Sequence, residues 1–85
     1  MATFRILITR RAVKDLKKIP PKLQDKARDI FLSILTEEPF SGEKLVGDLK
    51  GNYSYELSYK DRIVYSIDKK EKIVYVKRVK GHYGN

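Results

Sequence analysis

The sequence has no cysteine, no tryptophan and a single histidine among its 85 residues. Without thiolates, neither a disulfide nor a cysteine-ligated zinc site can form, and one histidine excludes a two-histidine ribonuclease pair. No stretch approaches the roughly 20 apolar residues that cross a bilayer, and the first residues lack the apolar run of a signal peptide. We therefore expect a cytoplasmic protein with no membrane association.

Other familiar sites are missing as well. The glycine patterns of P-loop and Rossmann nucleotide sites are absent, and the acidic residues are scattered or lie beside lysines instead of converging as a magnesium site requires. We expect no metal and no small-molecule cofactor. An enzyme with this inventory has to work with acid–base groups and cationic charge alone.

Positive charge is what the sequence has in excess. Its 19 lysines and arginines face 11 aspartates and glutamates, a net charge of +8. Such a field attracts polyanions, of which nucleic acid is the commonest. An acidic protein or an anionic membrane would feel the same field, and solubility alone is a further explanation.

The hydrophobic pattern predicts one α+β domain over residues 1–85, in the order β-α-α-β-β-β. Thr9 is the predicted N-cap of a first helix that runs to Ile19, and Pro20-Pro21 separates it from a second helix that ends before Pro39. The second helix carries an apolar stripe at helical spacing, made of Leu23, Ala27, Ile30, Phe31, Ile34 and Leu35. The predicted strands span residues 3–8, 53–59, 62–68 and 73–79. We expect an antiparallel meander with a helical hairpin on one face of the sheet, and a central position for the last strand.

Strand alternation predicts which side chains face the helices. Tyr55 and Leu57 point inward, whereas Ser54, Glu56 and Arg62 point to the opposite face. The tyrosines are expected to pack in the core. The opposite face is expected to be uncovered, polar and basic, as a platform for a nucleic acid strand would be.

RNA cleavage is a reaction that needs no metal, because the ribose 2′-hydroxyl is a built-in nucleophile. The protein must supply a base, a cation for the phosphate and an acid for the leaving 5′ oxygen. Arg62 on the uncovered face, Glu43 near its rim, and His82 with Tyr83 are the candidates. Taken singly, each of them also fits an ordinary surface residue.

The order and spacing of several short motifs resemble the RelE/ParE superfamily of toxins, closest to the YoeB/Txe branch. They are residues 9–16, residues 43–51, Tyr53-Ser54, residues 61–65 and His82-Tyr83-Gly84. The resemblance implies a RelE-like fold and a toxin of a type II toxin–antitoxin system that enters the ribosomal A site and cuts mRNA. It implies a partner antitoxin, which we expect to be acidic.

The resemblance also implies roles for single residues. Glu43 would act as general base, Arg62 would hold the phosphate, and His82 and Tyr83 would complete the catalytic set. The further cations expected to bind substrate are Lys50, Lys77, Arg78 and Lys80.

One position departs from the family pattern. Glu56 stands where relatives usually have a second arginine, and we expect it to lie beside Arg62, pair with it and attenuate cleavage. Two other functions stay open. A ParE-like inhibitor of DNA gyrase would have no need of Glu43 or of the His82-Tyr83 ending, whereas a non-catalytic RNA- or ribosome-binding module would tolerate Glu56.

Overall fold

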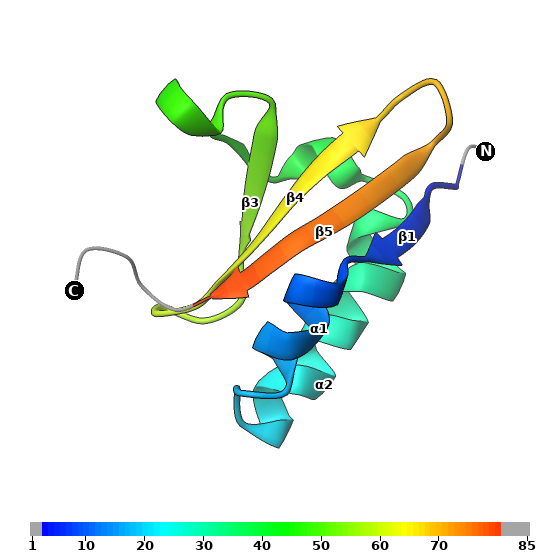
Figure 1. The fold of residues 1–85 in the computed structure, drawn as a ribbon. Coiled ribbons are helices and arrows are strands. Elements are labelled where there is room, and N and C mark those ends of the chain that lie inside the picture. Colours follow the sequence, from blue (N-terminus) through cyan, green and yellow to red (C-terminus); the bar gives the residue numbers. More distant parts are fainter. Residues whose placement is uncertain (1–2, 81–85) are drawn as a thin grey trace.

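A computed structural model describes residues 3–80 and shows one mixed sheet with two helices packed against it (Figure 1). The predicted α+β class is confirmed. The strands are β1 (Arg5–Ile8), β2 (Glu43–Lys44), β3 (Asn52–Glu56), β4 (Arg62–Asp68) and β5 (Ile73–Lys80). The helices are α1 (Arg10–Leu16) and α2 (Pro21–Ile30), followed by a π-helical turn η1 (Phe31–Leu35) and two short 3₁₀ turns, η2 (Pro39–Ser41) and η3 (Gly47–Leu49).

The strand order is β1-β5-β4-β3-β2. The last three strands form the expected antiparallel meander, and β5 is central, because β1 pairs with it in parallel on its other side. This position explains why residues 73–76 are apolar on both faces. The pairing of β4 with β5 shifts between Val64 and Tyr65, so that Lys77 is an extra residue in a β-bulge.

The core lies between the sheet and the helical hairpin. The predicted apolar stripe of the second helix is confirmed, since Ala27, Ile30, Phe31 and Leu35 are buried against β4 and β5 residues. Thr9 caps α1 by accepting a hydrogen bond from the Ala12 amide, as predicted. No helix within residues 3–80 has the length and apolar character needed to cross a bilayer.

Several boundaries differ from the predicted ones. The first helix ends at Leu16 instead of Ile19, and the Gln24 side-chain amide donates to the carbonyl oxygens of both residues at 2.9 and 3.0 Å. The third strand ends at Glu56 instead of residue 59. Ser58 and Asp61 form a tight turn there, with a 2.8 Å hydrogen bond between their side chains, and this turn removes the following residues from the sheet.

The face of the sheet opposite the helices is less bare than expected. Ser54 is 3% exposed and Val64 is 6% exposed, although both point away from the helical hairpin. The chain around η3 folds over them, and Leu45 and Leu49 enclose a hollow of about 190 Å³ with Ser54, Arg62 and Val64. The expectation of an uncovered polar face was therefore wrong for this part of the sheet.

Candidate active site

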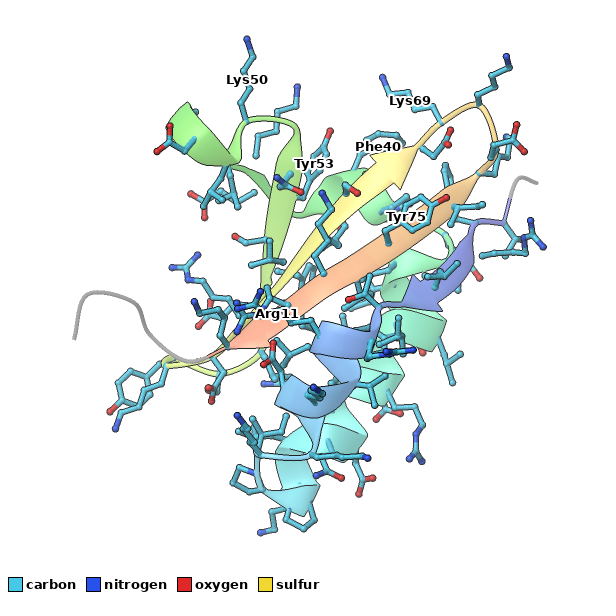
Figure 2. All side chains as sticks on the ribbon, viewed as in Figure 1. Arg11, Phe40, Lys50, Tyr53, Lys69 and Tyr75 are labelled. Atoms are coloured by element: carbon cyan, nitrogen blue, oxygen red, sulfur yellow. The ribbon has the colours of Figure 1, made fainter. Side chains whose placement is uncertain are left out.

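The chain leading to Glu43 is anchored by a buried tyrosine. Tyr65 of β4 is completely buried, and its hydroxyl donates a 2.7 Å hydrogen bond to the carbonyl oxygen of Pro39. Burial raises the pKa of this phenol to about 12, so the hydroxyl stays protonated and remains a donor. Its ring stacks on Tyr53, which contacts Phe40 edge-on (Figure 2). These contacts confirm a packing role for Tyr53 and Tyr65, whereas the expectation was wrong for Tyr59, which is 84% exposed.

Gly42 lets the chain pass close to this anchor. Any side chain at this position would collide with the Tyr65 hydroxyl oxygen, and its Cβ would lie 2.8 Å from the carbonyl oxygen of Ser54. The backbone of Gly42 is extended, so the glycine is needed for space and not for an unusual conformation. This close approach places the next residue, Glu43, in β2 directly opposite Ser54.

Glu43 and Arg62 meet at this edge of the sheet although 19 residues separate them. Arg62 Nη1 lies 3.5 Å from Glu43 Oε1 and 3.4 Å from Ser54 Oγ. The side chains of Arg62 and Glu43 are 48% and 74% exposed, so the pair is solvated and worth at most about 1 kcal/mol. A phosphate can therefore displace the carboxylate from the guanidinium at little cost.

The pair lies in a cleft of about 590 Å³ between α2 and the β2–β3 edge. Its strand side is polar and consists of Glu43, Ser54, Glu56 and Arg62, with Tyr55 beside them. Its helix side consists of Lys26, Ile30 and Ile34. A carboxylate, a guanidinium and a hydroxyl thus converge on one accessible space.

Glu56 lies directly across from Arg62 in the β3–β4 register, as strand alternation predicted. The expected ion pair between them was wrong, because in the part of the chain that the structure describes Arg62 pairs with Glu43 instead. The two-residue strand β2 brings the competing carboxylate to the guanidinium. Glu56 remains an acidic, exposed wall of the same cleft.

The predicted substrate-binding cations lie in different places. Lys80 is the register partner of Arg62, so it lies at the same end of the sheet, and Lys77 is exposed in the bulge. Lys50 lies at the opposite end of β3, where Figure 2 shows it at the tip of the turn. His82 and Tyr83 are outside the described residues, and their predicted roles remain predictions.

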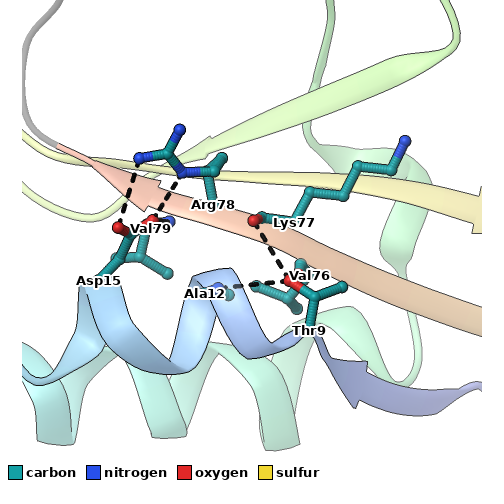
Figure 3. Close-up of polar contacts among 7 residues, drawn as sticks. All are labelled: Thr9, Ala12, Asp15, Val76, Lys77, Arg78 and Val79. Atoms are coloured by element: carbon teal, nitrogen blue, oxygen red, sulfur yellow. Dashed lines mark hydrogen bonds and ion pairs between the residues drawn. The ribbon is translucent and has the colours of Figure 1, made fainter.

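Arg78 is held by α1. Its Nε and Nη2 atoms donate to the Asp15 carboxylate at 2.8 and 3.4 Å, and the Val79 amide donates to the same carboxylate at 3.0 Å (Figure 3). Burial opposes ionisation of Asp15, but the hydrogen bonds from Arg78 and Val79 outweigh it and hold the pKa of Asp15 below its ordinary value. Arg78 therefore has a structural role, the ion pair with Asp15, and its predicted role in substrate binding stays a prediction.

Sequence reasoning did not identify Ser54, Gly42 or Lys26 as parts of this site. Alternation placed Ser54 on the correct face, but the two-residue strand that makes it a neighbour of Glu43 is too short to leave a pattern. Gly42 follows Ser41 in a stretch predicted to be a loop, where glycine is common, so the sequence did not mark it as a site residue. Lys26 lies four residues before Ile30, and that spacing was the available signal that it lies on the same helix face.

Comparison with known proteins agrees with the fold. Solved structures share the fold over nearly the whole chain, which places the protein in the RelE/ParE toxin superfamily. Residues 6–84 match the family of ParE-like toxins of type II bacterial toxin–antitoxin systems, and the chain belongs to that family. No curated protein matches the chain.

The similar structures include chains from toxin–antitoxin complexes of three organisms. A chain of the RelBE2 complex from Mycobacterium tuberculosis is 27% identical, with a TM-score of 0.88, and the match covers 99% of this chain and 97% of that one. The YoeB–YefM complex from Staphylococcus aureus has a chain that is 27% identical, with a TM-score of 0.75 and coverage of 96% and 100%. The RelE–RelB complex from Pyrococcus horikoshii has one that is 26% identical, with a TM-score of 0.76 and coverage of 98% and 99%.

Proposed function

We propose that this toxin is a metal-independent endoribonuclease that cuts messenger RNA in the ribosomal A site. The observation that carries the proposal is the convergence of Glu43, Arg62 and Ser54 at the edge of an open cleft. A carboxylate and a guanidinium in contact provide two of the three functions that RNA cleavage through the 2′-hydroxyl requires.

In the proposed reaction, Glu43 removes the proton from the ribose 2′-hydroxyl, and the 2′ oxygen attacks the adjacent phosphorus. Arg62 donates hydrogen bonds to the non-bridging oxygens, whose negative charge increases in the transition state. His82 protonates the 5′ oxygen as its bond to phosphorus breaks, and Tyr83 assists at the same end. The products are a 2′,3′-cyclic phosphate and a 5′-hydroxyl.

The proposed partners are the ribosome with its mRNA, in the cytoplasm, and a cognate antitoxin. The similar structures of M. tuberculosis, S. aureus and P. horikoshii are toxin–antitoxin complexes by name. A toxin of charge +8 favours an acidic antitoxin, because long-range attraction between opposite charges accelerates association. Covering Arg62 and the end of β5 would block RNA both sterically and by charge.

Incubation with translating ribosomes, followed by mapping of new mRNA 5′ ends, tests the proposal. Arg62→Gln should lower the single-turnover cleavage rate by about 10²–10³-fold, the effect of removing one transition-state donor. Arg5→Gln, an exposed arginine on β1, is the matched control and should cleave like the wild type. Products with 3′-hydroxyl ends, or wild-type protein that leaves the message intact, would contradict the proposal.

Inhibition of DNA gyrase is the second candidate, because the matched family is described as ParE-like. A binder of this kind would leave mRNA intact and block supercoiling of relaxed plasmid by gyrase. Its activity would be unaffected by Glu43→Gln, since inhibition by binding needs no general base. The same two assays on one preparation separate the two functions.

A further inference from the structure

The cleft beside Arg62 has a helical wall to which the proposed chemistry gives no role. Lys26, Ile30 and Ile34 line this wall at intervals of four residues, so they lie on one face of α2 and its continuation into η1. Ile30 is buried, whereas Lys26 is exposed at the mouth of the cleft. The wall is therefore apolar at its base and cationic at its entrance.

The charges in the cleft are unbalanced for an RNA substrate. The strand side carries the carboxylates of Glu43 and Glu56 against the single guanidinium of Arg62, which already contacts Glu43. A phosphodiester is an anion, and cleavage increases its charge in the transition state. The strand side alone would repel this charge more than it attracts it.

Lys26 lies on the helix side of the cleft and can supply the positive charge that the strand side lacks. Among residues 3–80, no carboxylate forms an ion pair with its ammonium group, in contrast to Arg62 and Arg78, which pair with Glu43 and Asp15. A lysine ammonium on a flexible stem can follow a phosphate through the reaction as a point charge.

We propose that the cleft binds single-stranded RNA and that Lys26 is a phosphate-binding residue in it. The phosphate lies between Lys26 and Arg62, and a neighbouring base packs against the apolar surface of Ile30, Ile34 and Tyr55. The cleft volume of about 590 Å³ lies within the roughly 300–1,000 Å³ of typical small-ligand sites. This inference rests on the proposed RNA substrate and adds the α2 side of the cleft to the binding site.

Single-turnover cleavage on programmed ribosomes tests the role of Lys26. Lys26→Gln should lower the cleavage rate about tenfold, the effect of losing one charged hydrogen bond. Lys26→Arg keeps the positive charge and should retain most of the wild-type rate. Arg28→Gln is the matched control, because Arg28 is an exposed cation of the same helix that lines a different hollow, beside Val13 and Phe31. Equal rates for Lys26→Gln and the wild type would overturn the inference.

A binding experiment keeps the inference separate from the proposed activity. An uncleavable trinucleotide with 2′-O-methyl riboses should shift the NMR signals of the Ile30 and Ile34 methyl groups, and Lys26→Gln should weaken its binding several-fold. Methyl shifts in a protein that does not cleave mRNA would refute the proposed activity and support the cleft as an RNA site. Normal cleavage with no shift of these methyl signals would refute the inference that this cleft binds RNA.

Discussion

Gly42→Ala is expected to disrupt the anchor that places Glu43. The added methyl group would collide with the Tyr65 hydroxyl oxygen and lie 2.8 Å from the Ser54 carbonyl oxygen. Tyr65 is fully buried and cannot move without breaking its 2.7 Å hydrogen bond to Pro39. β2 must therefore move away from β3, or the phenol must move away from Pro39.

The magnitude follows from these two contacts. Overpacking of a tight site costs about 1–3 kcal/mol, and leaving the Pro39 carbonyl without a donor adds about 1 kcal/mol or more. We expect Gly42→Ala to lower the free energy of unfolding by about 2–4 kcal/mol, which corresponds to a drop in Tm of roughly 10–30 °C for a domain of this size. Urea denaturation and thermal unfolding measure both quantities.

A second variant isolates the cause. In a Tyr65→Phe background the hydroxyl is absent, so Gly42→Ala should cost at least about 1 kcal/mol less than it does in the wild type. The contact with the Ser54 carbonyl remains, so the cost should not disappear. A Gly42→Ala protein as stable as the wild type, or an equal cost in both backgrounds, would refute the close approach as the reason for this glycine.

Three further predictions address other residues. Asp15→Asn should lower the free energy of unfolding by about 1–3 kcal/mol at pH 7. Because the folded-state pKa of Asp15 is lowered, its stabilisation is present above the ordinary pKa of 3.8 and is lost as the pH falls through the lowered value. Urea denaturation curves of the two proteins should therefore converge in acid, and a difference that stays constant with pH would contradict this prediction. Glu56→Arg should raise single-turnover cleavage about 10²–10³-fold by changing the charge of the cleft, and equal rates would show that Glu56 is an inert solvated acid. His82→Gln should slow cleavage about 10²-fold with an unchanged Tm, and full activity would exclude His82 as the acid.

Regular elements were predictable where local pattern and tertiary packing agree. The span of β4 was predicted to the residue, and the stripe from Ala27 to Leu35 identified the buried helix face, because both patterns directly reflect burial. The π-helical turn at Phe31–Leu35 was not predictable, since it keeps the same apolar residues in contact with the sheet. The parallel pairing of β1 with β5 was also open, because no local signal specifies a partner 68 residues away.

Only some members of the candidate site were predictable, namely Glu43, Arg62 and Glu56, and its geometry was less so. Alternation placed Arg62, Ser54 and Glu56 on one face, and this placement is confirmed. The contact between Arg62 and Glu43 depends on the fit of Gly42 against Tyr65, a tertiary contact that leaves no periodic pattern in the sequence. The proposed roles of Glu43, Arg62, His82 and Tyr83 remain predictions for the cleavage assay.

The parallel pairing of β1 with β5 bears on how the protein folds during synthesis. Arg5 pairs with Ile73 and Ile8 with Val76, so β1 leaves the ribosome first among the five strands yet needs the one that leaves last. Contacts of such long sequence separation form late, because the intervening chain must first be closed into a loop. Until residues 73–80 emerge from the exit tunnel, β1 and β4 lack their neighbour, and the backbone N–H and C=O groups that will pair with β5 stay unpaired. The nascent chain therefore passes through a stage in which its strand edges are open, when a chaperone or an early-binding partner would have access to them.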